Sequence, residues 1–125
     1  MRNCDYEGYA IRYNVKQPDG KTILKDAFKN CDGQTVPFVY NFYQNGGTHI
    51  RDTSPENVLG MAYLENREDG VYARCELYDT PLCVELKKFG LEKCIKNLTV
   101  FARLCEIHEQ EVVRGIIMAV EVISM

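Results

Sequence analysis

Hydrophobic and polar residues alternate along much of this chain with a period of two, the spacing that places successive side chains on opposite faces of a β-strand. The segment 6–15 (YEGYAIRYNV) shows this pattern, with Tyr9, Ile11 and Tyr13 on one side of the alternation. We therefore expect a strand here, with two different faces.

Further strands are expected from the same alternation and from their β-branched and aromatic residues. The segments 58–65 and 70–78 are joined by NREDG, whose glycine supplies the bend, so they predict a hairpin. The second arm should turn four residues toward the core, namely Val71, Ala73, Cys75 and Leu77. The other expected strands are 36–41, 97–107 and 111–124.

One segment, 80–90 (TPLCVELKKFG), predicts a helix instead. Thr80 can cap its start and Gly90 can end it. Its apolar residues recur at i, i+4 and i+7, so we expect this stripe to be buried on the sheet and Lys87 and Lys88 to be exposed; the stripe is Leu82, Leu86 and Phe89.

Together these elements predict one domain, 1–125, of the α+β class. It should contain a small, β-rich, barrel-like sheet packed by one or two helices. Pattern and composition alone lead no further than this description.

The order of the elements resembles the prohead proteases of tailed bacteriophages, the serine proteases that mature capsids and whose fold is similar to herpesvirus assemblin. The likeness covers about residues 6–123, and its most specific part is PENVLGMAYLENREDGVYA (55–73). The resemblance implies a prohead protease-like fold and a phage capsid or scaffold protein as the partner. It also implies location in the host cytoplasm, or within the prohead.

Active members of this family use a serine, a histidine and an acidic residue, because a hydroxyl becomes a good nucleophile only when an oriented imidazole takes its proton. By the resemblance, the histidine position falls on Phe42, the serine position on Thr99 and the acidic position on Ala119. Since phenylalanine cannot accept a proton, we expect a catalytically inactive domain that acts as a binding or assembly module in capsid morphogenesis.

Two alternatives stay open. A divergent protease would use Thr99 with His49, which lies in the long polar stretch 43–57. A repurposed phage protein would instead bind a host factor, and a homo-oligomer is compatible with either alternative. The other histidine, His108, is flanked by acidic residues and is expected in a surface turn.

Charge and cysteine content limit the kinds of ligand and partner that we expect. The formal net charge is −3, so no overall positive field favours nucleic acid. No apolar run is long enough for a membrane span. The six cysteines lack metal-binding spacing and are expected to be free thiols, so neither a metal nor a cofactor is expected. Four carboxylates are expected on a solvated hairpin face, namely Glu65, Glu68, Asp69 and Glu76.

Overall fold

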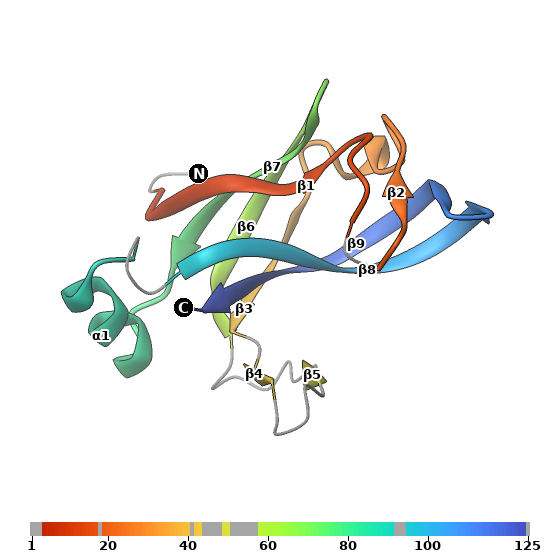
Figure 1. Cartoon of the computed structure of the whole chain (residues 1–125). Coiled ribbons are helices and arrows are strands. Elements are labelled where there is room, and N and C mark those ends of the chain that lie inside the picture. The colour runs from red at the N-terminus through yellow and green to blue at the C-terminus, as the bar shows by residue number, and fades with distance from the viewer. Residues whose placement is uncertain are drawn as a thin grey trace.

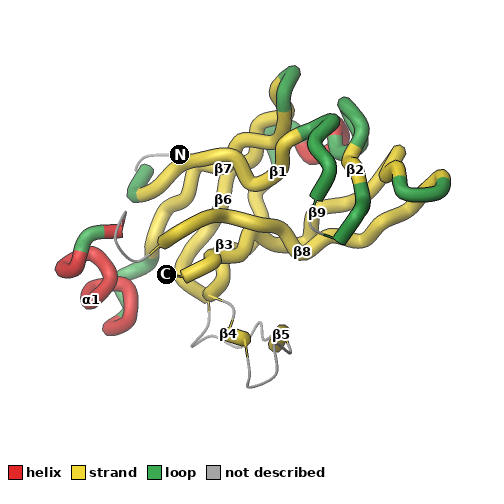
Figure 2. The backbone as a smooth tube through the Cα atoms, in the orientation of Figure 1, coloured by secondary structure: helices red, strands yellow, loops and turns green. Residues whose placement is uncertain are grey.

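The computed structural model of the chain describes residues 4–17, 19–40, 42–43, 49–50, 58–91 and 95–124; for 40, 42–43, 49–50, 95–97 and 123–124 it describes the backbone alone. Strands make up most of this part (Figure 2). They are β1 (Tyr6–Arg12), β2 (Thr22–Ile23), β3 (Thr35–Tyr40), β4 (Phe42–Tyr43), β5 (His49–Ile50), β6 (Val58–Arg67), β7 (Gly70–Leu77), β8 (Ile95–His108) and β9 (Glu111–Ser124). The helical elements are α1 (Pro81–Phe89) and a short 3-10 turn, η1 (Lys29–Cys31).

One sheet contains seven of the strands, in the order β1, β7, β6, β3, β9 and β2, with β8 paired to β9 along its length. The sheet curls into a half-barrel, which brings β8 beside β1 at the opposite edge (Figure 1). No ladder joins β1 to β8 in the part of the chain that the structure describes, so the seam between them is open. The prediction of a β-rich α+β fold with a barrel-like sheet is confirmed.

The inside of the half-barrel is the hydrophobic core. The hairpin of β6 and β7 contributes to this core as the alternation predicts. All four residues that β7 was expected to turn inward are buried, namely Val71, Ala73, Cys75 and Leu77. The largest side chains with almost no exposed surface come from several strands and from the segment before η1: Phe28, Phe38, Leu59, Leu64, Val71, Val112, Val120 and Val122.

A bulge interrupts the alternation in β1. Tyr9 pairs with Tyr72 and Ile11 pairs with Val71, so Ala10 is an extra residue in the strand. Ala10 and Ile11 are both buried, whereas the ring of Tyr9 meets the ring of Tyr72 edge to face, with 5.1 Å between their centroids. The prediction that Tyr9 shares a face with Ile11 is therefore wrong.

Helix α1 begins and ends as its sequence predicts. The Thr80 hydroxyl accepts a hydrogen bond from the Cys83 amide at 3.3 Å, and Gly90 ends the helix with a φ of 90°. No helix in the described residues is long and apolar enough to cross a bilayer.

The buried stripe of α1 differs from the prediction. Phe89 is 68% exposed and Leu82 is also exposed, while Leu86 is only partly buried. The helix lies at one end of the half-barrel and not across a sheet face (Figure 1), so the sheet covers only a narrow stripe of the helix. Cys83 is the buried residue of this stripe, and its thiol donates a hydrogen bond to the Leu59 carbonyl at 3.2 Å.

The cysteines of the described residues are free thiols, and their burial predicts how they react. Cys4 and Cys105 are exposed, whereas the buried thiols are those of Cys31, Cys75 and Cys83. Burial raises the pKa of Cys75 to about 12 and that of Cys31 to about 11. Because the thiolate is the reacting form, both burial and these pKa values should slow the reaction.

We therefore expect pulse alkylation of the folded protein at about pH 8 to label Cys4 and Cys105 before the three buried thiols of the described residues. The three buried thiols should be labelled only after unfolding. Peptide mass spectrometry with isotopically distinct reagents before and after denaturation measures this order. Rapid labelling of Cys75 in the folded protein would show that β7 opens locally.

Candidate functional site

Strand β3 lies beside the hairpin of β8 and β9, although several elements separate them in the sequence. Strand β9 lies between β3 and β8 (Figure 1). It runs parallel to β3, with Val39 beside Glu121, and antiparallel to β8, with Thr99 opposite Glu121. The strand that leads to Phe42 and the strands that carry Thr99 and Ala119 are thus neighbours.

Thr99 and Ala119 lie on the same face of this three-stranded region. Leu98 pairs with Val122 on the core side, so the residues next to them in sequence point to the outer face. Phe101 pairs with Ala119, which makes Thr99 and Ala119 diagonal neighbours across the two strands. The structure therefore brings the serine and acidic positions together.

Phe42 and His49 lie in a separate two-stranded ladder. Phe42 of β4 pairs with Ile50 of β5, and Tyr43 pairs with His49. The side chains of Phe42 and His49 lie outside the described residues. The use of His49 with Thr99 in a divergent protease therefore stays a prediction, as does the placement of the histidine position at Phe42.

Glu121 is a candidate site residue that the sequence interpretation missed. It is 3% exposed, and it lies directly opposite Thr99 on the outer face of β8 and β9. A buried carboxylate is costly unless the protein compensates its charge, so such a residue is more often functional or part of a network. A signal was present, because Glu121 is the one charged residue in the apolar run GIIMAVEVIS (115–124).

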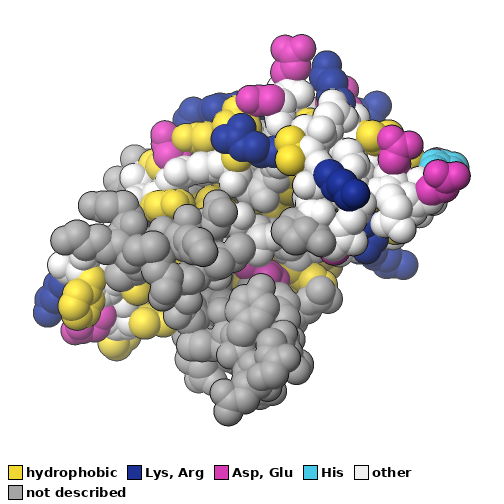
Figure 3. Space-filling view, viewed as in Figure 1, with side chains coloured by type: hydrophobic (Ala, Val, Ile, Leu, Met, Phe, Trp, Pro, Cys, Tyr) yellow, Lys and Arg dark blue, Asp and Glu magenta, His cyan; other side chains and the backbone are white. Residues whose placement is uncertain are grey.

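The remaining charged candidates are surface groups. His108 lies at the exposed turn between β8 and β9, where its Nε2 is 2.7 Å from Glu106 Oε2. Glu65 accepts two hydrogen bonds from the Arg67 guanidinium, at 2.8 and 3.2 Å, and forms an ion pair with Arg74 at 3.2 Å. Basic and acidic side chains are intermingled on the face shown in Figure 3.

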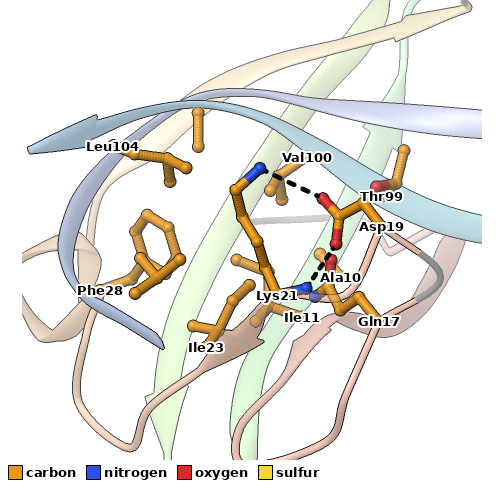
Figure 4. A pocket seen from close by; sticks show the side chains of 12 residues that line it. Ala10, Ile11, Gln17, Asp19, Lys21, Ile23, Phe28, Thr99, Val100 and Leu104 are labelled. Carbon is orange, nitrogen blue, oxygen red and sulfur yellow. Dashed lines mark hydrogen bonds and ion pairs between the residues drawn. The ribbon is translucent and has the colours of Figure 1, made fainter. Parts of the chain in front are cut away.

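A pocket of about 230 Å³ lies where the seam between β1 and β8 widens. Its lining includes Ile11, Ile23, Phe28 and Thr99, and the surface open to the pocket is at least as polar as it is apolar. Lys21 reaches across the pocket toward Asp19 (Figure 4), with 3.7 Å between Nζ and the carboxylate. Ile11, Ile23 and Phe28 are nearly fully buried, so they offer little surface to a ligand, whereas Asp19 and Lys21 are partly exposed.

Comparison of the chain with models of known protein families, with curated proteins and with solved structures finds no match. Among the residues that the structure describes, no three His, Cys, Asp or Glu side chains are grouped so that they could hold a metal ion.

Proposed function

We propose that this chain is a prohead protease-like domain, encoded by a phage or prophage, that has lost catalysis and binds capsid or scaffold protein during capsid assembly. It would act in the host cytoplasm or inside the prohead. The proposal combines the resemblance of the sequence with the arrangement of the strands.

The observation that carries the proposal is the meeting of Thr99 and Ala119 on adjacent strands, beside the strand that leads to Phe42. Strands β8 and β9 form one hairpin, so the less expected contact is that of β3 with β9, which β6, β7 and α1 separate in the sequence. This contact supports the alignment with the family. At those positions, phenylalanine replaces the base and alanine replaces the acidic residue, so the triad chemistry would lack both supporting groups.

A binding role also agrees with the strand edges. Strand β8 pairs with β9 on one side, and no strand of the described part pairs with its other side. Its distal half extends past the body of the half-barrel (Figure 1). An open edge of this kind can take an extended peptide as an added strand, in which main-chain hydrogen bonds supply affinity.

One observation favours the second candidate, a divergent protease. The buried Glu121 lies opposite Thr99 and could take over the role of the absent acidic residue. His49 would then have to supply the base. Such an enzyme would cleave capsid or scaffold protein by attack of the Thr99 hydroxyl on a peptide carbonyl.

Co-incubation with capsid and scaffold proteins of the phage or prophage that encodes the chain distinguishes these functions. We expect a complex with one of them on size exclusion, and intact masses that show no cleavage. Thr99→Ala should leave both results unchanged, because the hydroxyl has no catalytic role in the proposal. Cleavage that Thr99→Ala abolishes would establish the protease instead, and binding to a host protein alone would favour the repurposed module.

A further inference from the structure

Residues 102–108 form the distal half of β8, and one side of this stretch has no partner strand in the described part of the chain. Strand β9 pairs with the other side. Strand β1 contacts the first half of β8, where an added Cβ on Gly8 would lie 3.8 Å from Leu98. The distal half extends past the body of the half-barrel (Figure 1), and residues 103–108 are all exposed. An unpaired edge of this kind is a template for another strand.

The backbone groups of Leu104 and Ile107 point to this free edge. Their partners on β9 bond away from β8, because the Val112 carbonyl accepts from the Leu24 amide and the Gly115 amide donates to the segment after β2, each at 3.0 Å. In an antiparallel ladder, the two residues of such a pair turn their backbone groups away from each other. The edge therefore offers donors and acceptors that no described loop residue uses.

The distal half of β8 contains an extra residue that changes which side chains share a face. Leu104 pairs with Gly115 and Glu106 pairs with Arg114, so Cys105 is the extra residue of a bulge. One extra residue shifts the alternation of side chains by one position. Residues on either side of the bulge that are three apart in sequence therefore share a face.

Arg103 and Glu106 both lie on the outer face as a result. Leu104 lines the pocket between β1 and β8, and Ile107 lies opposite the buried Val112, so these two face inward. Their neighbours Arg103 and Glu106 face outward. Among the described residues, the Arg103 guanidinium has no ion-pair partner.

The edge is complementary to itself in the antiparallel sense. About the midpoint between Arg103 and Glu106, the cation on one side corresponds to the anion on the other, and Ala102 corresponds to Ile107. A second copy related by a twofold axis through this point would place each Arg103 opposite a Glu106. It would also place each Ile107 opposite an Ala102. Opposite charges and apolar side chains are favourable cross-strand pairs.

We propose that two copies of this chain form a dimer in which the distal halves of β8 pair antiparallel, so that the two sheets become continuous. Each Arg103 forms an ion pair with Glu106 of the second copy, and the backbone groups of Leu104 and Ile107 supply hydrogen bonds. The Ile107 side chain, which is 41% exposed in one copy, is then partly covered. The self-complementary charges select a second copy as the occupant, since such an interface uses the same patch twice.

The dimer does not depend on the capsid-related function, because it needs only this chain. A capsid segment that adds to the same edge would have to displace the second copy. Failure of capsid binding would therefore leave the dimer standing, and a monomeric chain would leave capsid binding standing.

Sedimentation velocity of the purified chain tests for the dimer. A ladder of about six residues from each copy buries less than the roughly 800 Å² per partner of a standard interface, so we expect a dissociation constant of about 10 to 100 µM. Monomers should give way to dimers between about 2 and 500 µM. A chain that stays monomeric over this range would overturn the proposal.

A charge exchange tests the register. Arg103→Glu and Glu106→Arg should each weaken the dimer by about tenfold or more, because each places like charges opposite each other twice. The double variant restores opposite charges and should return the dissociation constant to within about threefold of wild type. Lys88→Glu is the matched control and should change nothing, since Lys88 is exposed on α1 at the other end of the half-barrel (Figure 1). A double variant that dissociates as readily as the single variants would overturn the proposal.

A backbone substitution tests the hydrogen bonds of the edge separately. Ile107→Pro removes an amide that faces the free edge and leaves the ladder with β9 intact, so the monomer should fold and the dimer should be lost. Ile107→Ala keeps the amide and should weaken the dimer less. If Ile107→Pro does not fold, the charge exchange still decides the matter, because Arg103 and Glu106 are surface side chains. A folded Ile107→Pro protein that dimerises as well as wild type would contradict the proposal.

Discussion

Replacement of Phe28 by alanine should lower the free energy of unfolding by about 3 to 5 kcal/mol, the range for loss of a fully buried aromatic ring. Phe28 is 0% exposed and lies between the turn after β2 and strand β9. Its ring covers Gly115, where an added Cβ would lie only 2.5 Å from Phe28 Cε1. The glycine and the ring thus fit together, and removal of the ring leaves a cavity that joins the pocket between β1 and β8.

Phe89→Ala is the matched control for this change. The same atoms are removed, yet Phe89 is 68% exposed, so the free energy of unfolding should change by less than about 0.5 kcal/mol. Urea denaturation of the two variants, followed by circular dichroism, gives the comparison. Similar losses for both variants would mean that the sequence-based prediction of a buried Phe89 was right.

A single methyl group at Gly60 should be nearly as destabilising, with a loss of about 3 kcal/mol. Gly60 pairs with Leu77 across the hairpin of β6 and β7. A Cβ at this position would fall onto the Glu76 carbonyl oxygen and lie 2.9 Å from Leu77 Cα. Because this overlap involves backbone atoms, it can be relieved only if the two strands separate and lose hydrogen bonds of the ladder.

Gly8→Ala provides the contrast. Gly8 is also a strand glycine, but its added Cβ would meet only Leu98 Cδ1, at an ordinary contact distance of 3.8 Å. The change should alter stability by less than about 0.5 kcal/mol, because alanine also restricts the unfolded chain. Thermal melts of the two variants measure the difference. A Gly60→Ala protein as stable as Gly8→Ala would contradict the close approach of β6 to β7.

The alternation of hydrophobic and polar residues predicted the positions of the strands well. It predicted less well which side chains of a strand face the core. In β7 the pattern continues without interruption, and its core face was predicted correctly. In β1, the extra residue Ala10 turns Tyr9 to the outside. A bulge depends on how a strand pairs with its neighbour, which the pattern within one strand does not contain, and one extra residue reverses every side chain beyond it.

Helix α1 shows the same division between local and tertiary information. Its ends were predicted because the Thr80 cap and the Gly90 end depend on residues within the segment itself. Its buried face was not, because the position of the helix at the end of the half-barrel decides which stripe is covered. Cys83 therefore takes the place that the stripe of larger apolar residues was expected to occupy.

The register of β8 against β9 decides which residue lies opposite Thr99, and sequence distance alone does not show this register. The resemblance placed the acidic position on Ala119. A bulge in β9, with Met118 as its extra residue, directly precedes Ala119, and the carboxylate that lies opposite Thr99 is that of Glu121. The seam pocket was equally beyond prediction, because its lining comes from segments that only the curled sheet brings together.

The most direct test of a non-catalytic site uses a reagent that needs no knowledge of the natural substrate. The intact mass of the chain should be measured after incubation with excess diisopropyl fluorophosphate, which forms a covalent adduct with activated hydroxyl nucleophiles. We predict an unmodified mass, because the Thr99 hydroxyl would lack the base that activates it. A single adduct on Thr99, absent in Thr99→Ala and slower to form in Glu121→Gln, would contradict the account and identify a working protease.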